Sequence, residues 1–264
     1  MRKYFAYFRS SLMRTLAYRG QLIIYTLATL FAVVPAVAVW SGMAGNGAGG
    51  YSKVDLISYY VAGLFIQRLV YSSLINYYVH EITSDGSIVG LFLTKPVSFY
   101  WATYAMGLGW LAIAAVVGVI MTILFSTIIG VGITAQLTFP TVFLTILAIF
   151  LATILVFCSS LVLGSLALWT THITSFVSLY WIGLLLFGGI TFPLAFFPNN
   201  VQQILIFNPY RFMFSFPLEI LFSKINFLEI IFGFGLTLLW IFIFSYLYKI
   251  MWRRGVKVYS GYGQ

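Results

Sequence analysis

The stretch from Trp101 to Ile129 reads WATYAMGLGWLAIAAVVGVIMTILFSTII and contains no charged residue. An α-helix rises 1.5 Å per residue and crosses the bilayer core in about 20 residues, so this stretch is long enough to span it. A transmembrane β-strand would alternate apolar and polar side chains, which this stretch does not do. No Asp, Glu, Lys or Arg occurs from Pro96 to Tyr210. The sequence therefore predicts membrane-spanning helices.

The composition extends this prediction to the whole chain. Hydrophobic residues make up 62% of the 264 residues and charged residues 7%, whereas a soluble domain carries about 25% charged residues. Every backbone N–H and C=O in a bilayer must be satisfied internally, which leaves helices or a closed barrel. We expect an all-α, polytopic integral membrane protein that forms a single transmembrane domain over residues 1–264.

Six apolar stretches are of membrane-crossing length or close to it. Turn chemistry divides the charge-free region, because Gly130 through Pro140 and Trp169 through His172 interrupt it. The predicted spans are Gly20–Trp40, Leu56–Val79, Trp101–Ile129, Thr141–Leu168, Phe176–Phe192 and Ile230–Tyr248.

The formal charge of +9 comes largely from the two tails of the chain. The basic residues nearest the ends are Arg2, Lys3, Arg9, Arg14, Arg19, Lys249, Arg253, Arg254 and Lys257. Basic residues next to membrane spans stay on the cytoplasmic side. We therefore expect both termini in the cytoplasm, an even number of spans and no role in nucleic-acid binding. Residues 80–98 would then be cytoplasmic, and residues 193–226 would lie outside.

The region of residues 193–226 is apolar but interrupted by Pro193, Pro198, Pro209 and Pro217. Irregular backbone at membrane depth is tolerated where it is buried in protein or lines a watery cavity. We interpret this region as short re-entrant or interfacial helices before the last span. Three aromatic residues at its start could gate an outer exit or line a dimer interface: Phe192, Phe196 and Phe197.

Four charged residues follow in or near the same region. Glu219 and Glu229 could pair with Arg211 and Lys224. Nothing in the sequence supports paired carboxylates for hydrolysis. His80 and His172 stand apart from other metal-ligating residues, so we expect neither a metal site nor a catalytic residue.

Residues 1–19 are predicted to form an amphipathic interfacial helix. Phe5, Phe8, Leu12 and Leu16 share one face of it. Such a helix lies in the membrane interface with its basic side near anionic headgroups. A cytoplasmic tail, residues 252–264, is expected at the other end of the chain.

Arg68, next to Gln67, lies near the middle of the second predicted span. A charged residue there costs about 2.5–3.5 kcal/mol on insertion scales, so we expect Arg68 to face protein or a hydrated cavity and not lipid. It could line a translocation path or form a salt bridge across a dimer interface. Alternatively, it could hydrogen-bond to carbonyl groups or to a tyrosine such as Tyr71.

Residues 80–98 contain a short amphipathic helix pattern. Ile88, Leu91 and Phe92 share a helical face, Asp85 can cap the helix, and Pro96 ends it. An interfacial helix on the lipid surface would have this pattern. A helix that docks into a groove of a soluble partner would have it too.

Three segments of the chain resemble type-2 ATP-binding-cassette (ABC) exporter permeases. The first is Glu81-Ile82 through Gly86-Ser87-Ile88 to Lys95-Pro96-Val97-Ser98. The second is Gly188-Gly189 through Pro193 to Asn208-Pro209-Tyr210, and the third is Trp252-Arg253-Arg254-Gly255 with its glycine-ended tail. The likeness covers essentially the whole chain, and it is carried by the order and spacing of these segments.

The resemblance implies a function and a set of partners. Segment 80–98 would be the coupling helix that contacts a separate ABC ATPase, through Glu81, Asp85, Gly86, Ile88, Leu91, Phe92, Lys95 and Pro96. Two permeases, identical or related, would pair in a bacterial or archaeal plasma membrane and export an amphipathic or lipophilic substrate by alternating access. The chain has no Gly-x-x-x-x-Gly-Lys-[Ser/Thr] loop, so ATP and Mg²⁺ are expected on the partner and no cofactor on this chain.

Two other classes of function compete with this one. An ion-coupled secondary transporter usually carries carboxylates within its spans, and none of the five acidic residues lies within a confidently predicted span. A membrane-embedded enzyme would need a cluster of His, Asp or Glu near one interface, and the sequence has none. We therefore expect a transport protein that is not itself an enzyme.

Overall fold

The computed structural model describes residues 2–43, 52–71, 95–135, 137–170 and 173–258, and every regular element within these ranges is a helix. The elements are α1 (Arg2–Ala17), α2 (Arg19–Met43), α3 (Lys53–Tyr71), α6 (Phe99–Ile129), α7 (Phe139–Leu166), α8 (Ile173–Phe187), η3 (Leu194–Phe196), α9 (Asn199–Leu205), α10 (Pro209–Met213), α11 (Ser215–Leu221) and α12 (Phe227–Val258).

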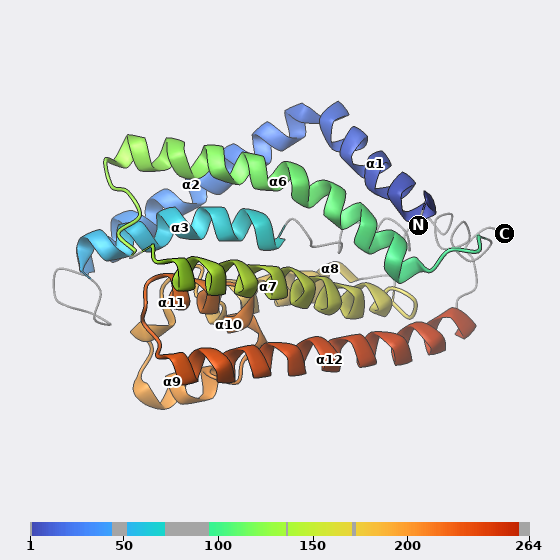
Figure 1. Cartoon of the computed structure of the whole chain (residues 1–264). Coiled ribbons are helices and arrows are strands. Elements are labelled where there is room, and N and C mark those ends of the chain that lie inside the picture. Colours follow the sequence, from blue (N-terminus) through green and yellow to red (C-terminus); the bar gives the residue numbers. More distant parts are fainter. Residues whose placement is uncertain (1, 44–51, 72–94, 136, 171–172, 259–264) are drawn as a thin grey trace.

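Six of these helices overlap the six predicted spans, although residues 72–79 of the second span lie outside the described residues. Successive members run in opposite directions through one elongated bundle, so the start of α1 and the end of α12 lie at the same end of it (Figure 1). By length and composition, four of the described helices can cross a membrane: α2, α6, α7 and α12. The described part of α3 has 19 residues and is less apolar, and α8 has 15.

Helix α3 lies at the centre of the bundle. It packs against α2, α6 and α7, and most of its side chains from Leu56 to Val70 are buried. The other long helices instead turn large apolar side chains outward, such as Phe31 on α2, Ile128 on α6 and Phe242 on α12. An exposed apolar surface of this kind suits contact with lipid, because a soluble protein rarely exposes so much of it.

The turns between helices follow the sequence signals. Gly130 ends α6 in the left-handed conformation (φ 73°), which glycine adopts without steric cost, and Pro140 lies in the first turn of α7. Asn226 and Glu229 cap the start of α12 reciprocally. The Asn226 N–H donates to Glu229 Oε2 at 2.7 Å, and the Glu229 N–H donates to Asn226 Oδ1 at 2.9 Å.

The predicted fifth span, Phe176–Phe192, was wrong at its C-terminal boundary, because α8 ends at Phe187. Gly189 has a φ of 89°, which helical backbone does not allow, and the Thr191 N–H donates back to the Leu185 carbonyl at 3.2 Å. The chain therefore leaves the helix five residues earlier than its apolar character suggested.

Residues 193–226 form the short helices η3, α9, α10 and α11 at one end of the bundle (Figure 1). Asn208 caps α10 by accepting a bond from the Tyr210 N–H at 3.0 Å. Helices α10 and α11 pack against α7, and their apolar residues Phe212, Phe214 and Phe216 are buried in the main core. Helices α10 and α11 are therefore part of the packed interior, whereas α9 is largely exposed.

Helix α1 packs against the first third of α6. The Ser11 hydroxyl donates to the Met106 carbonyl at 2.8 Å, and Gly109 lets the α1 backbone come close, since a Cβ there would lie 2.6 Å from the Phe8 carbonyl oxygen. Phe5 and Leu16 of the predicted apolar face are exposed. Helix α1 is thus attached to the bundle through Ser11, and it leaves part of its apolar face uncovered.

Candidate functional site

Arg68 lies between α3 and α6. The stem of its side chain rests against Gly118, where an added Cβ would lie 3.3 Å from the Arg68 Cβ, and its guanidinium carbon is 6.0 Å from the centroid of the Trp110 ring. Trp110, Ala114 and Gly118 follow each other at intervals of four residues, so they share one face of α6. Gly118, which has no side chain, thus makes room for the Arg68 stem.

The guanidinium group of Arg68 is partly without partners. Its Nε and Nη2 atoms are buried and have no hydrogen-bond partner within the described residues. The side chain as a whole is half-buried. Its contacts with Gly118 and Trp110 agree with the prediction that Arg68 is turned toward protein.

Tyr71 follows Arg68 by one helical turn. Its ring lies 5.5 Å from the Trp181 ring of α8 and 6.4 Å from the Phe214 ring, measured between centroids. The Tyr71 hydroxyl is buried and also lacks a partner among the described residues. The hydrogen bond between Arg68 and Tyr71 considered from the sequence is therefore not formed. Gln67 is half-buried beside them.

A second arginine, Arg211, is fully paired. Its Nη2 donates to Glu219 Oε2 at 2.6 Å and its Nε at 3.1 Å, while the Ser215 hydroxyl donates to Glu219 Oε1 at 3.0 Å. The rings of Phe212 and Phe216 each lie within 6 Å of the guanidinium carbon, and their centroids are 5.5 Å apart. The ion pair predicted for Arg211 and Glu219 is confirmed.

The other predicted partners have different roles. Glu229 caps α12, as described above. The pKa of Asp55, at the start of α3, is lowered mainly by a hydrogen bond from the Ser52 hydroxyl at 2.8 Å and to a lesser degree by Thr134 and the charge of Lys224. Asp55 therefore stays ionised and holds the turn after α6 against the start of α3.

Two tyrosines attach α3 to the turn that follows α8. The Tyr59 hydroxyl donates to the Gly189 carbonyl at 2.7 Å, and the Tyr60 hydroxyl donates to the Thr191 carbonyl at 2.6 Å. Sequence reasoning missed these bonds. The Gly188-Gly189 pair, which favours a turn after an apolar helix, was the available signal.

The aromatic residues proposed as an exit gate lie beside that turn. Phe192 and Phe197 are in contact, with ring centroids 5.1 Å apart, while Phe196 packs against the main core. All three are half-buried. Tyr60 precedes Arg68 by eight residues, or about 12 Å of helix. The structure thus separates the site residues into an aromatic group near Tyr60 and a polar group at Arg68.

Most of the predicted coupling segment lies outside the described residues: Glu81, Asp85, Gly86, Ile88, Leu91 and Phe92. Lys95 and Pro96 are described and exposed. Just beyond them, Phe99 at the start of α6 stacks on Trp252 of α12, with centroids 4.4 Å apart. The chain that leaves the segment is thereby fixed to the C-terminal helix.

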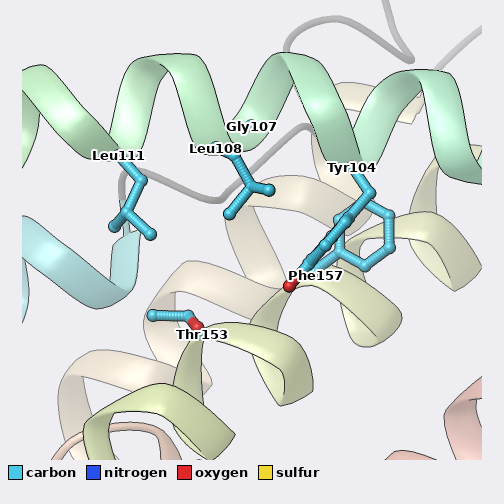
Figure 2. A pocket seen from close by; sticks show the side chains of 6 residues that line it. All are labelled: Tyr104, Gly107, Leu108, Leu111, Thr153 and Phe157. Carbon is cyan, nitrogen blue, oxygen red and sulfur yellow. The ribbon is translucent and has the colours of Figure 1, made fainter. Parts of the chain in front are cut away.

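A small hollow opens between α6 and α7, lined by Tyr104, Gly107, Leu108, Leu111, Thr153 and Phe157 (Figure 2). Leu108 and Leu111 point from α6 toward α7, and the rings of Tyr104 and Phe157 meet at 5.1 Å. The Thr153 hydroxyl already donates to the Phe150 carbonyl of its own helix. The hollow therefore offers mainly apolar contacts. Among the described residues, no three of His, Cys, Asp or Glu gather to hold a metal.

Comparison with known proteins identifies the kind of membrane protein. A family model described as "ABC-2 family transporter protein" matches residues 22–263, which is nearly the whole chain. No curated protein matches significantly. The matched range includes α3, the Arg211–Glu219 pair and the segment before Phe99.

Proposed function

This chain belongs to the ABC-2 transporter family, and we propose that it is the permease subunit of an ATP-driven exporter. Members of this family are membrane components of transporters, and membership implies association with an ABC ATPase. The finer proposal is that two permease chains, identical or related, move an amphipathic or lipophilic substrate outward by alternating access. ATP and Mg²⁺ would be bound by the partner ATPase, in the plasma membrane of a bacterium or archaeon.

The family match over residues 22–263 is the observation that carries this proposal. The physical arrangement supports it. Polar and charged side chains that can respond to a cargo lie on the central helix α3, while the surrounding helices α2, α6 and α12 present apolar surface. Mechanical coupling is assigned to segment 80–98, which continues directly into α6 through Pro96 and Phe99.

The test is copurification of the full chain with an ATPase in mild detergent. We expect an ATP-binding protein to be recovered with the wild type and lost with Ile88→Asp or Leu91→Asp, because a carboxylate on the apolar face cannot enter a hydrophobic groove. Val258→Asp, which places the same carboxylate at an exposed position beyond the last predicted span, is the control for general damage, and Ile88→Leu is the conservative control. Recovery that is unchanged in both Asp variants would contradict the proposed contact.

An ion-coupled secondary transporter is the alternative. Transport measured in sealed vesicles distinguishes the two mechanisms, since ATP-driven export stops when ATP is withdrawn. Export that continues without ATP under a proton gradient would favour the alternative.

A further inference from the structure

Arg68 carries a charge whose counter-charge is not among the described residues. The chain has five acidic residues, of which Asp55, Glu219 and Glu229 are described. Each of the three accepts bonds elsewhere: Asp55 from Ser52, Glu219 from Arg211 and Glu229 from Asn226. A cation in an apolar setting without an anion is costly, so this position favours binding of an anion.

Arg68 and the residue about one turn after it on α3 both carry unused donors. Its Nε and Nη2 atoms are buried and unpartnered within the described residues, and so is the Tyr71 hydroxyl three residues later. Positions three apart on an α-helix are separated by about 60° around the axis and one turn along it. The Trp110 ring lies 6.0 Å from the guanidinium carbon and supports the cation. Arg68 as a whole residue is half-buried, so part of its surface stays accessible.

The donor geometry selects a class of ligand. A guanidinium group presents N–H donors in a planar fork that fits a carboxylate or phosphate with two parallel bonds. The packing of the Arg68 stem on Gly118 limits the positions this fork can take. A lipophilic cation would instead be repelled by the unneutralised positive charge of Arg68.

We infer that Arg68 binds the anionic group, a phosphate or a carboxylate, of a lipophilic cargo, with Tyr71 as a second donor. This narrows the substrate class of the proposed exporter and rests on that function. Hydrophobic cations are thereby disfavoured as substrates. Arg68 acts here as a specificity-determining residue and not as a partner in a structural ion pair.

The experiment measures binding of two radiolabelled probes with the same tail, dodecyl phosphate and dodecyltrimethylammonium, to the full chain in phosphatidylcholine nanodiscs. We expect the wild type to prefer the phosphate by about tenfold or more, as for hydrogen bonds to a charged group. Arg68→Gln should lose this preference and Arg68→Lys should keep part of it. Lys249→Gln, which removes an exposed basic residue, should leave it unchanged.

Three results would overturn the inference. The first is an undiminished preference for the phosphate in Arg68→Gln. The second is loss of wild-type probe binding when the nanodiscs contain phosphatidylglycerol, which would identify a resident lipid as the anion. The third is a tenfold gain in affinity in Glu81→Gln or Asp85→Asn, which would identify an internal partner of Arg68.

Two further measurements keep the outcome interpretable. Thermal unfolding of each variant in the same nanodiscs checks that Arg68→Gln is folded, and partial rescue by Arg68→Lys separates loss of charge from loss of packing. No ATPase is present in the binding assay. Failure of this inference would therefore leave the copurification result intact, and failure of copurification would leave the binding result intact.

Discussion

Arg68 and Arg211 are both surrounded by apolar and aromatic side chains, yet their environments differ in one respect. Arg211 is bound by Glu219 through two nitrogens, with Nη2 at 2.6 Å. Arg68 has an aromatic neighbour, Trp110, but no carboxylate among the described residues. The first arrangement is complete within the described residues. The second is incomplete, as expected for a site that receives something from outside the chain.

The same difference appears in the packing beneath each arginine. The Phe216 ring, which lies beside Arg211, presses on Gly233 of α12, where an added Cβ would lie within 2.5 Å of ring atoms. At Gly118 an added Cβ would lie 3.3 Å from the Arg68 Cβ, which is tight, but the neighbour there is a flexible stem. A tightly packed ion pair serves stability, whereas an unpaired donor on a flexible stem can adjust to a ligand.

The largest loss of stability is expected when the ion pair of Arg211 and Glu219 is broken. Glu219→Ala should lower the free energy of unfolding by about 3 kcal/mol, because it leaves the Arg211 guanidinium unpaired among aromatic rings. The measurement is unfolding of the purified chain by dodecyl sulfate in mixed micelles. The double variant Arg211→Leu with Glu219→Leu should lose much less, since neither charge remains. Equal losses in the single and double variants would show that the pair itself is not what holds α10 and α11.

A smaller loss of stability is expected when a methyl group is added at either of two glycines, Gly233 or Gly118. Gly233→Ala should cost about 2 kcal/mol, because the Phe216 ring must move in a packed core. Gly118→Ala should cost under about 1 kcal/mol, because the Arg68 stem can shift by a few tenths of an ångström. Both are measured by the same unfolding assay. If Gly118→Ala proved the more damaging of the two, the contrast between a loose and a tight site would be wrong.

The smallest change in stability is expected at Arg68 itself. Arg68→Leu should alter the free energy of unfolding by less than about 1 kcal/mol, or raise it, because removing an unpaired charge breaks no described hydrogen bond. Tyr180→Phe, which removes a buried hydroxyl 2.8 Å from the Ser159 hydroxyl, is a control that does break a hydrogen bond. A loss of several kcal/mol in Arg68→Leu would mean that Arg68 is a structural residue with a partner in the native chain.

Much of the helical arrangement could be predicted from the sequence. Six of the described helices follow largely apolar stretches, interrupted in α3 by Gln67 and Arg68, and the turns at Gly130 and Trp169 follow local chemistry. The end of α8 could not be placed, because Phe187 to Phe192 remains apolar while the backbone at Gly189 has already turned. The bonds from Tyr59 and Tyr60 that fix this turn join residues about 130 positions apart, and no local pattern encodes such a contact.

The candidate site likewise has features that the sequence predicts and features that it does not. Arg68 and the pair of Arg211 with Glu219 were identifiable because charges are rare in this chain and costly in a membrane. The contact of Arg68 with Trp110 could not be foreseen, since it depends on the relative rotation and register of α3 and α6. The rings of Phe192 and Phe197 are in contact, but the structure places them beside Tyr60, about two turns of α3 from Arg68.

The sequence by itself determined that this chain enters a membrane as a set of helices and that few of its side chains can bind a polar ligand. Both follow from the cost of placing charge and unpaired backbone in hydrocarbon, which depends on local composition. The tertiary structure decided which of two similar arginines is neutralised. That outcome depends on which helix faces come together, because Glu219 lies one helix beyond Arg211, whereas α6 offers Arg68 a glycine and an indole ring.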